Sequence, residues 1–521
     1  MTTFPPTIPI KSLKETASDY NQYAETYRTV ADLYQGGSVL RDKVIKSGYY
    51  LLQKPKEASE VFRTRQQGFT YTNLLSNVIG WYGSALYKVP AQIVKTRKGV
   101  DGDGAAKIPA EAEAFCNAIE KDCDRAGTAF VDFWRKAFDS LMLNRAAYVL
   151  IDLPAPDADE PAPASLAEQQ KTGKLDPYLV LYTPSQVINW ETDRYGNLEW
   201  VIIAVANEDR EPFKPCVTVD SWYYFDREQV ACYQAVRKDE KAGEEQRAEL
   251  VQGYPRKHAM SDLKQIPVRK VEAPEGLWLA NRVFLLLLNH LRLDNGYDFG
   301  LFQSAFAQLV ISGNFDDSVV MSEVTYLHLP EGTTAEYLEP EGKAYEAIDR
   351  RLQSLEERIY KTCYLMDQAR SNKSTPTAQS GASKQQDKTP SRDTLAGFGD
   401  IIRPAMQLVY SDMLAVRGMD DIVPDVRGFD FEDRADAQDI QLDMQAMAID
   451  INSDTYRHER DKDFAQKRLP DANKELLTKI FEEIDVNPTP EAAAQALLEA
   501  QQAQQIDKFS SSFQGADKTA A

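Results

Sequence analysis

One stretch, residues 274–312, limits the fold of this chain more than any other. It contains GLWLANRVFLLLLNHLRL (276–293), the most apolar run in a chain whose mean hydropathy is -0.47. A membrane span needs about 20 uninterrupted apolar residues, and Arg282 and Asp294 are among the charged residues that interrupt this run. Apolar residues recur at helical spacing on both faces. The stretch therefore predicts a helix covered nearly all round, either inside a large core or with one face against a neighbouring subunit.

Length and composition place the chain among ordinary globular proteins. It has 521 residues, of which 43% are hydrophobic and 27% charged, enough for several sub-domains. Five cysteines without a CxxC pair indicate a reducing compartment, with Cys116 and Cys123 as small buried side chains. The N-terminus lacks the basic and apolar regions of a signal peptide.

The net charge of -20 limits the partners of the chain. Tight non-specific binding to nucleic acid works through Lys and Arg that neutralise phosphates, so this charge disfavours it. A surface past which DNA slides is compatible with the charge, because a repulsive wall prevents sticking. Solubility alone is the simpler interpretation.

Hydropathy patterns predict helices at both ends and strands in the middle. Helices are expected over 12–34, 39–50, 58–86, 132–143, 343–367 and 394–416, the last with a kink at Pro404, and over 440–451, 453–467, 471–484 and 491–505 near the C-terminus. Strands are expected at 147–152, 178–182, 186–190, 200–206, 222–225, 230–236, 325–329 and 335–338. A disordered tail is expected after residue 509. The predicted fold class is α+β and predominantly helical.

A polar segment at 370–391 separates two of the expected helices. It is rich in Ser, Thr, Lys and Gln and cannot build a core. Its cations could meet a polyanion while the rest of the chain repels one. An ordinary surface loop explains the composition equally well.

The sequence shows no catalytic centre. Its four histidines are scattered, and neither an HExxH nor a GxSxG motif occurs. The acid pairs Glu356-Glu357 and Asp420-Asp421 point in different directions on a helix, which is typical of solvated charge. We therefore expect no catalytic, cofactor-binding or metal residues, and no cofactor; the pattern favours a structural or conduit protein over an enzyme.

Several stretches, taken in order, resemble the portal proteins of tailed bacteriophages, in the group with an N-terminal helical wing. They are GYYLLQKPKEASEVFRTRQ and TNLLSNVIGWYGSALYKVP within 34–90, LNRAAYVLIDLP (143–154), PYLVLYTPSQVINW (177–190), LVISG (309–313) and LPEGTTAEYLEPEGKAYEAIDRRLQSLEERI (329–359). Their shared order covers most of residues 30–415. The stretch before LVISG departs from the family by being more apolar.

The resemblance implies a portal-like subunit with wing, stem, clip and crown. In its order, 1–150 would form a helical wing, 151–273 a β-rich wing, 274–330 stem and clip, 331–367 wing strands and a channel-facing helix, 368–391 a tunnel loop, 392–435 a helix to the crown, and 436–521 the crown and a flexible tail. Residues of the tunnel loop that would face DNA are Arg370, Asn372, Lys373, Gln379, Lys384 and Lys388. In the stem, Phe284, Leu287 and Leu291 would contact the adjacent subunit.

The resemblance also implies the setting of the protein. The copies would form a ring, a dodecamer, at one capsid vertex of the virion, assembled in the host cytoplasm. The ring would pass double-stranded DNA non-specifically during packaging and ejection, without a membrane. It would dock the terminase large subunit as packaging motor, the major capsid or scaffold protein, and a head-tail adaptor protein.

Two other classes of function stay open. One is a capsid-associated adaptor or minor head structural protein without DNA passage. The other is a metal- or nucleotide-dependent enzyme, for which we expect no hydrolysis by the purified chain.

Overall fold

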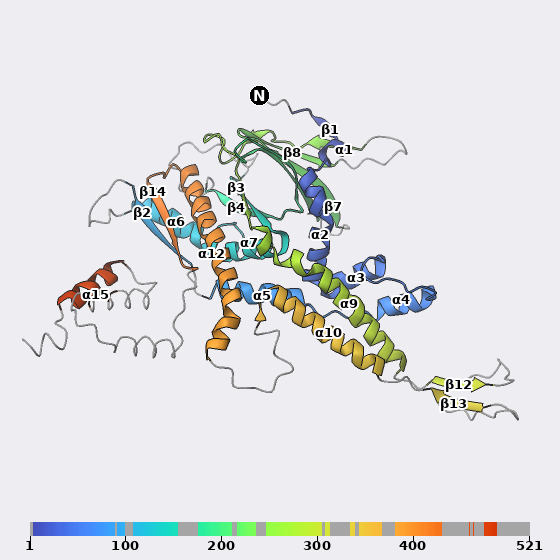
Figure 1. The fold of residues 1–521 in the computed structure, drawn as a ribbon. Helices are drawn as coiled ribbons and strands as arrows, with labels where there is room; N and C mark the ends of the chain where they lie inside the picture. The colour runs from blue at the N-terminus through green and yellow to red at the C-terminus, as the bar shows by residue number, and fades with distance from the viewer. Residues whose placement is uncertain are drawn as a thin grey trace, which may run out of the picture. The chain divides into compact units, whose positions relative to one another are not determined.

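The computed structural model (Figure 1) describes residues 4–88, 91–98, 108–154, 176–210, 216–235, 246–304, 308–312, 334–338, 343–366, 381–429, 458, 462 and 474–486. The chain forms two compact units, Met1–Asp430 and Phe431–Ala521. Helices and antiparallel strands are both present in the first unit, so the predicted α+β class is confirmed. Among these residues no helix is long and apolar enough to cross a membrane.

The β-rich middle third forms one large antiparallel sheet. Its order is β1-β9-β8-β7-β6-β5, with β10 beside β8. The strands are β1 (Thr7–Pro9), β5 (Val187–Thr192), β6 (Leu198–Asp209), β7 (Val217–Phe225), β8 (Gln229–Ala235), β9 (Arg247–Leu250) and β10 (Arg256–Lys257). The four strands predicted between 186 and 236 are confirmed. β1 was not predicted, and its pairing with β9 joins the N-terminus to this sheet.

The N-terminal helices are shorter than their hydropathy predicts. They are α1 (Ile10–Leu13), α2 (Ser18–Gln35), α3 (Gly37–Lys46), α4 (Ser59–Gln67) and α5 (Leu74–Leu86). The single helix predicted over 58–86 is wrong, because Asn73 starts a new helix by accepting the Ser76 N–H at 3.0 Å. Gly36 ends α2 at φ 58°, and a Cβ there would meet the Asn73 side chain at 2.9 Å.

A second sheet and a buried helix form the centre of the first unit. The sheet order is β11-β3-β4, from β3 (Ala146–Asp152), β4 (Tyr178–Tyr182) and β11 (Val268–Glu272). The helices are α6 (Ala110–Lys121) and α7 (Phe130–Asn144). Arg145, with φ 68°, turns the chain from α7 into β3. The first six residues of β3 are buried, as a near-continuous apolar strand should be.

The long helix α12 (Gly381–Val416) lies beside this centre and contains Pro390 and Pro404. Its Phe398 ring lies 4.9 Å from the Phe138 ring of α7. The helix begins before the predicted start at 394, so residues 381–391 are helical and not part of a loop. After α12, β14 (Ile422–Arg427) pairs antiparallel with β2 (Gln92–Arg97), and neither strand was predicted.

In the second unit the structure describes the helix α15 (Lys474–Val486), which confirms the prediction over 471–484. The predicted helices 440–451 and 491–505 and the predicted tail lie outside the described residues, and 453–467 is described only at 458 and 462. The expected strand 325–329 also lies outside them.

Candidate functional site

The helix of the predicted stem region and the predicted channel-facing helix form an antiparallel pair, here called the stalk. It consists of α9 (Leu279–Ser304) and α10 (Lys343–Thr362), preceded by the short 3-10 helix η1 (Glu275–Leu277). Three contacts fix the register of the pair. Arg282 meets Tyr364, His290 lies 3.4 Å from Glu356, and the Tyr345 hydroxyl donates to the Gly300 carbonyl at 3.1 Å. Later residues of α9 contact earlier residues of α10. The two helices therefore run antiparallel and lie side by side over most of their length (Figure 1).

A β-hairpin connects the two stalk helices. β12 (Gln308–Ser312) pairs antiparallel with β13 (Thr334–Leu338), with Gln308 opposite Leu338 and Ser312 opposite Thr334. It follows the C-terminal end of α9 and precedes the N-terminal end of α10, so chain order places it at one end of the stalk (Figure 1). The strand predicted at 335–338 is therefore confirmed as β13.

The stalk is anchored to the rest of the first unit where α9 begins. The Trp278 indole donates to the Leu143 carbonyl at 2.8 Å, and its ring lies 5.2 Å from Tyr23 and 5.8 Å from Tyr27 of α2. Trp278 is fully buried. A buried ring with its polar atom satisfied fixes both position and rotation, so the first turn of α9 cannot swivel independently of α2 and α7.

Two of the three predicted subunit contacts lie inside the chain's own core. Leu287 and Leu291 are each 1% exposed, packed where α9 meets its neighbouring helices. Side chains that the chain buries in its own core offer little surface to another copy; the assignment of these two to a subunit interface stays a prediction. Phe284 is half-buried, and Leu285 beside it is 67% exposed. The large apolar side chains that α9 leaves exposed are Leu285 and, near its C-terminal end, Leu301 and Phe302, and sequence reasoning missed all three.

The inner face of the stalk carries a polar group of residues. His290 and Asn295 are 3% and 1% exposed, and the Asn295 side-chain oxygen has no hydrogen-bond partner among the described residues. His290 Nε2 stands at ion-pair distance from Glu356 Oε1 without hydrogen-bond geometry. Burial raises the pKa of Asp294, with smaller contributions from His290, which lowers it, and from Asp298 and Glu356. Buried polar atoms of this kind reduce the stability of a helix pair.

A tight turn ends the stalk where the predicted tunnel loop begins. Tyr364 adopts φ 62°, and the Leu365 N–H donates to the Tyr360 carbonyl at 2.9 Å, which closes the helix end. Arg282 donates to the Tyr364 hydroxyl and to the Gly276 carbonyl, with its guanidinium 4.5 Å from the Tyr364 ring centre. Burial raises the pKa of the adjacent Cys363 thiol to about 12. These contacts fix the direction in which the chain leaves α10.

The structure describes only two of the six predicted tunnel-loop residues. Arg370, Asn372, Lys373 and Gln379 lie outside the described residues. Lys384 and Lys388 lie on the first turns of α12. Of the described ends of this segment, residue 366 is helical and follows the Tyr364 turn, and residue 381 is the first residue of α12.

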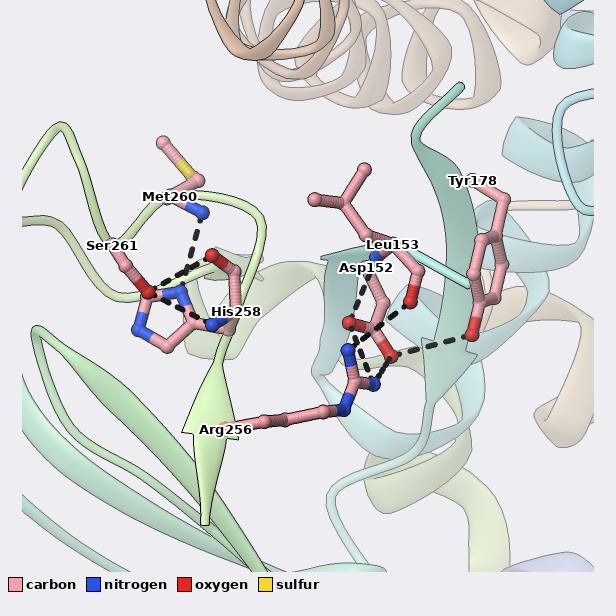
Figure 2. Close-up of polar contacts among 7 residues, drawn as sticks. All are labelled: Asp152, Leu153, Tyr178, Arg256, His258, Met260 and Ser261. Atoms are coloured by element: carbon pink, nitrogen blue, oxygen red, sulfur yellow. Dashed lines mark hydrogen bonds and ion pairs between the residues drawn. The ribbon is translucent and has the colours of Figure 1, made fainter. Parts of the chain in front are cut away.

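A buried polar cluster joins the two sheets (Figure 2). Arg256 of β10 forms an ion pair with Asp152 of β3 at 3.3 Å, and the Tyr178 hydroxyl of β4 donates to the same carboxylate at 3.2 Å. The Met260 N–H donates to His258 Nδ1 at 3.2 Å, so Nε2 carries the proton and donates to the Asp226 carbonyl at 2.9 Å. Burial lowers the pKa of His258. The ionisable side chains of this cluster all contact other residues of the chain, and the Arg256–Asp152 ion pair links the two sheets.

Two clefts in the described part of the chain lie beside α2 and α12. One of about 220 Å³ lies between α2 and the start of β3 and is lined by Tyr23, Tyr27 and Arg145. Another of about 630 Å³ lies beside α12, near Arg269 and Asp412, which pair at 2.7 Å. Within the described ranges no group of three His, Cys, Asp or Glu residues could hold a metal ion.

Comparisons with known proteins give likenesses among solved structures. No family model matches the sequence, and no curated protein matches it. The chain is similar to one from the neck of an empty GTA particle computed with C6 symmetry, at TM-score 0.38 and 10% identity over 79% of this chain and 95% of that one. It is similar to one from the virion of a native gene transfer agent (GTA) particle, at 0.37 and 10% over 81% and 98%. A third, from the neck of a native GTA particle computed with C12 symmetry, matches at 0.32 and 10% over 84% and 96%.

Proposed function

We propose that this chain is a portal protein, forming a ring at one vertex of a capsid through which double-stranded DNA passes in packaging and ejection. The observation that carries the proposal is the stalk, an antiparallel helix pair closed by a β-hairpin and anchored to a wing of helices and sheets. The sequence resemblance implies stem and clip for residues 274–330, which contain α9 and β12, and wing strands and a channel-facing helix for 331–367, which contain β13 and α10; here we assign both helices to the stem and the hairpin to the clip. The three similar chains come from the neck or the virion of GTA particles. We propose a comparable location for this chain.

The surface of the stalk supports a ring. α9 leaves Leu285 at 67% exposure while Leu287 is buried, so one apolar face remains after the chain has folded. A head-to-tail ring covers such a face with a different surface of the next copy. The net charge of -20 supports a wall that DNA passes without binding tightly.

In this proposal the segment between residues 366 and 381 is the tunnel loop. Its described ends are the Tyr364 turn and the first turn of α12, which carries Lys384 and Lys388. The packaging motor, the capsid or scaffold protein and the head-tail adaptor are the proposed protein partners. The chemistry of nucleotide hydrolysis is assigned to the motor, so the proposed chain is not an enzyme.

The first test is the mass of the assembled protein. Light scattering or native mass spectrometry should give about twelve times the 58.7 kDa of one chain. A monomer at every concentration, with capsid present as well as absent, would exclude the proposal.

The second test separates DNA passage from a purely structural role. Deleting residues 368–380, and leaving α12 intact, should shorten the packaged DNA or release it early while the ring still forms. Unchanged packaged length and retention would support an adaptor or minor head protein without DNA passage.

A further inference from the structure

A helical hairpin near the stalk carries an unusual surface. Residues 37–67, here called the basic hairpin, comprise α3, α4 and their connection, with seven Lys or Arg against three Asp or Glu in a chain of net charge -20. Among the described residues ten large hydrophobic side chains are exposed, and four of them lie here: Val39, Ile45, Leu52 and Val61. Cations and aliphatic side chains together are typical of a contact surface.

Ion pairs within the chain neutralise only some of the Lys and Arg side chains of the basic hairpin. Lys43 pairs with Asp32, and Arg65 pairs with Glu57 at 2.9 Å. Lys46, Lys56 and Arg63 are exposed and form no ion pair with a described residue. Their positive charge is therefore available to an acidic partner.

The connection between α3 and α4 is held firmly. Arg65 and Glu57 have side chains only 4% and 7% exposed, and Arg65 also donates to the Leu52 carbonyl at 2.7 Å. The buried ion pair thus fixes the main chain of Leu52, whose side chain is 58% exposed. An apolar side chain that is presented outward from a fixed main chain loses little entropy on binding.

The basic hairpin is tied to the stalk. Arg292 of α9 donates to the Tyr49 carbonyl at 2.7 Å and to the Tyr50 carbonyl at 3.0 Å. Arg292 follows Leu285 by two helical turns, so both project from one face of α9. The exposed side chain of Leu285 and the basic hairpin therefore belong to the same side of α9.

We propose that the basic hairpin is a contact with a second copy of this chain, whose acidic surface it binds. This inference rests on the proposed ring. Chains of net charge -20 repel one another, so assembly needs a place where charges are opposite. The hairpin is positive, and the remainder of each copy carries an excess of acids. Its aliphatic side chains exclude water from the contact, and continuity with Leu285 extends it along the stalk.

The test compares two triple variants of equal charge change in the full chain. K46E/K56E/R63E reverses the hairpin, and R194E/K257E/K264E reverses three exposed cations on the β-rich part. We expect the hairpin variant to raise the concentration for half-assembly by about tenfold or more, measured by light scattering, and the control to assemble as the wild type. Circular dichroism checks that both remain folded.

A second pair of variants tests the apolar part without changing charge. Leu52→Ser should weaken assembly, whereas Tyr195→Ser, at a side chain 73% exposed on a β-turn, should not. The two results together support the contact, because both variants keep the buried core, and a Leu52→Ser variant that assembles like the wild type would contradict it.

Other outcomes overturn the inference. If both triple variants assemble like the wild type, the basic hairpin is not a subunit contact. Loss of binding to anionic vesicles or to double-stranded DNA in the hairpin variant alone would then assign the surface to another partner. If both fail equally, total charge and not the hairpin controls assembly. A wild-type chain that never forms a ring would instead refute the proposed function itself.

Discussion

The hydroxyl of Tyr82 donates a 2.7 Å hydrogen bond to the main-chain carbonyl of Cys363, which lies 281 residues further along the chain. Tyr82 belongs to α5, and Cys363 is the first residue after α10. Both side chains are fully buried. This bond, with the Arg282 contacts to Tyr364, attaches the end of the stalk to the helical wing, and burial raises the pKa of the Tyr82 hydroxyl.

Replacing Tyr82 by Phe should lower the stability of this junction. The change removes only the donor and leaves the buried Cys363 carbonyl without this hydrogen bond, which costs about 1–3 kcal/mol. Thermal unfolding at fixed protein concentration should show a lower midpoint. Tyr195→Phe is the matched control, because that ring is 73% exposed and its midpoint should not change. An unchanged midpoint for Tyr82→Phe would show that the bond contributes nothing.

Asp139 of α7 should destabilise the folded chain at neutral pH. Burial raises its pKa to about 6, and Arg135 lowers it only in part. A carboxyl whose pKa is raised on folding stabilises the chain below its unfolded value, near 3.8, and loses that contribution as the pH rises through about 6. Asp139→Asn should therefore raise the free energy of unfolding by about 2 kcal/mol at pH 7.5. The gain should disappear near pH 4.

The exposed Asp132 on the same helix provides the control for this measurement. Asp132→Asn should leave the unfolding midpoint unchanged at both pH values. An equal gain from Asp132→Asn would mean that net charge, and not the burial of Asp139, is responsible.

His258 should act with the opposite sign. Burial lowers its pKa below the ordinary value of 6.5, and both ring nitrogens already have partners. A histidine that is neutral when folded gives full stability above its unfolded pKa, and that stability falls as the pH drops below about 6.5. His258→Gln should flatten the loss of stability between about pH 6.5 and 5. Thermal midpoints of the variant and the wild type across this range test it, and parallel curves would contradict it.

The elements predicted from sequence are those with a strong local pattern. In α10, Leu352, Leu355 and Ile359 repeat at helical spacing and are buried as predicted. The pairing of β2 with β14 joins segments more than 300 residues apart, and Pro424 within β14 masks the strand pattern. Such a pairing leaves no signal in either segment alone.

The division of the stem residues between core and surface could not be predicted for a related reason. Every residue from Phe284 to Leu288 is apolar, so hydropathy cannot predict which of them are buried and which are exposed. Leu287 is buried and Leu285 exposed because α2, α5, α7 and α10 surround only part of α9. The sequence at 381–391 is polar and was therefore predicted as a loop, but it forms the first turns of α12. Tertiary contacts decide both cases.

Two aspartate substitutions, two residues apart, separate the ring surface of α9 from its core. Leu287→Asp places a charge where the side chain is 1% exposed and should destabilise the monomer by about 3 kcal/mol or more. Leu285→Asp changes a side chain that is 67% exposed, so the monomer should keep its thermal midpoint. In the proposed ring the same change puts a charge into a subunit contact. Light scattering should then show that Leu285→Asp remains a folded monomer, and a normal ring from this variant would remove Leu285 from the interface.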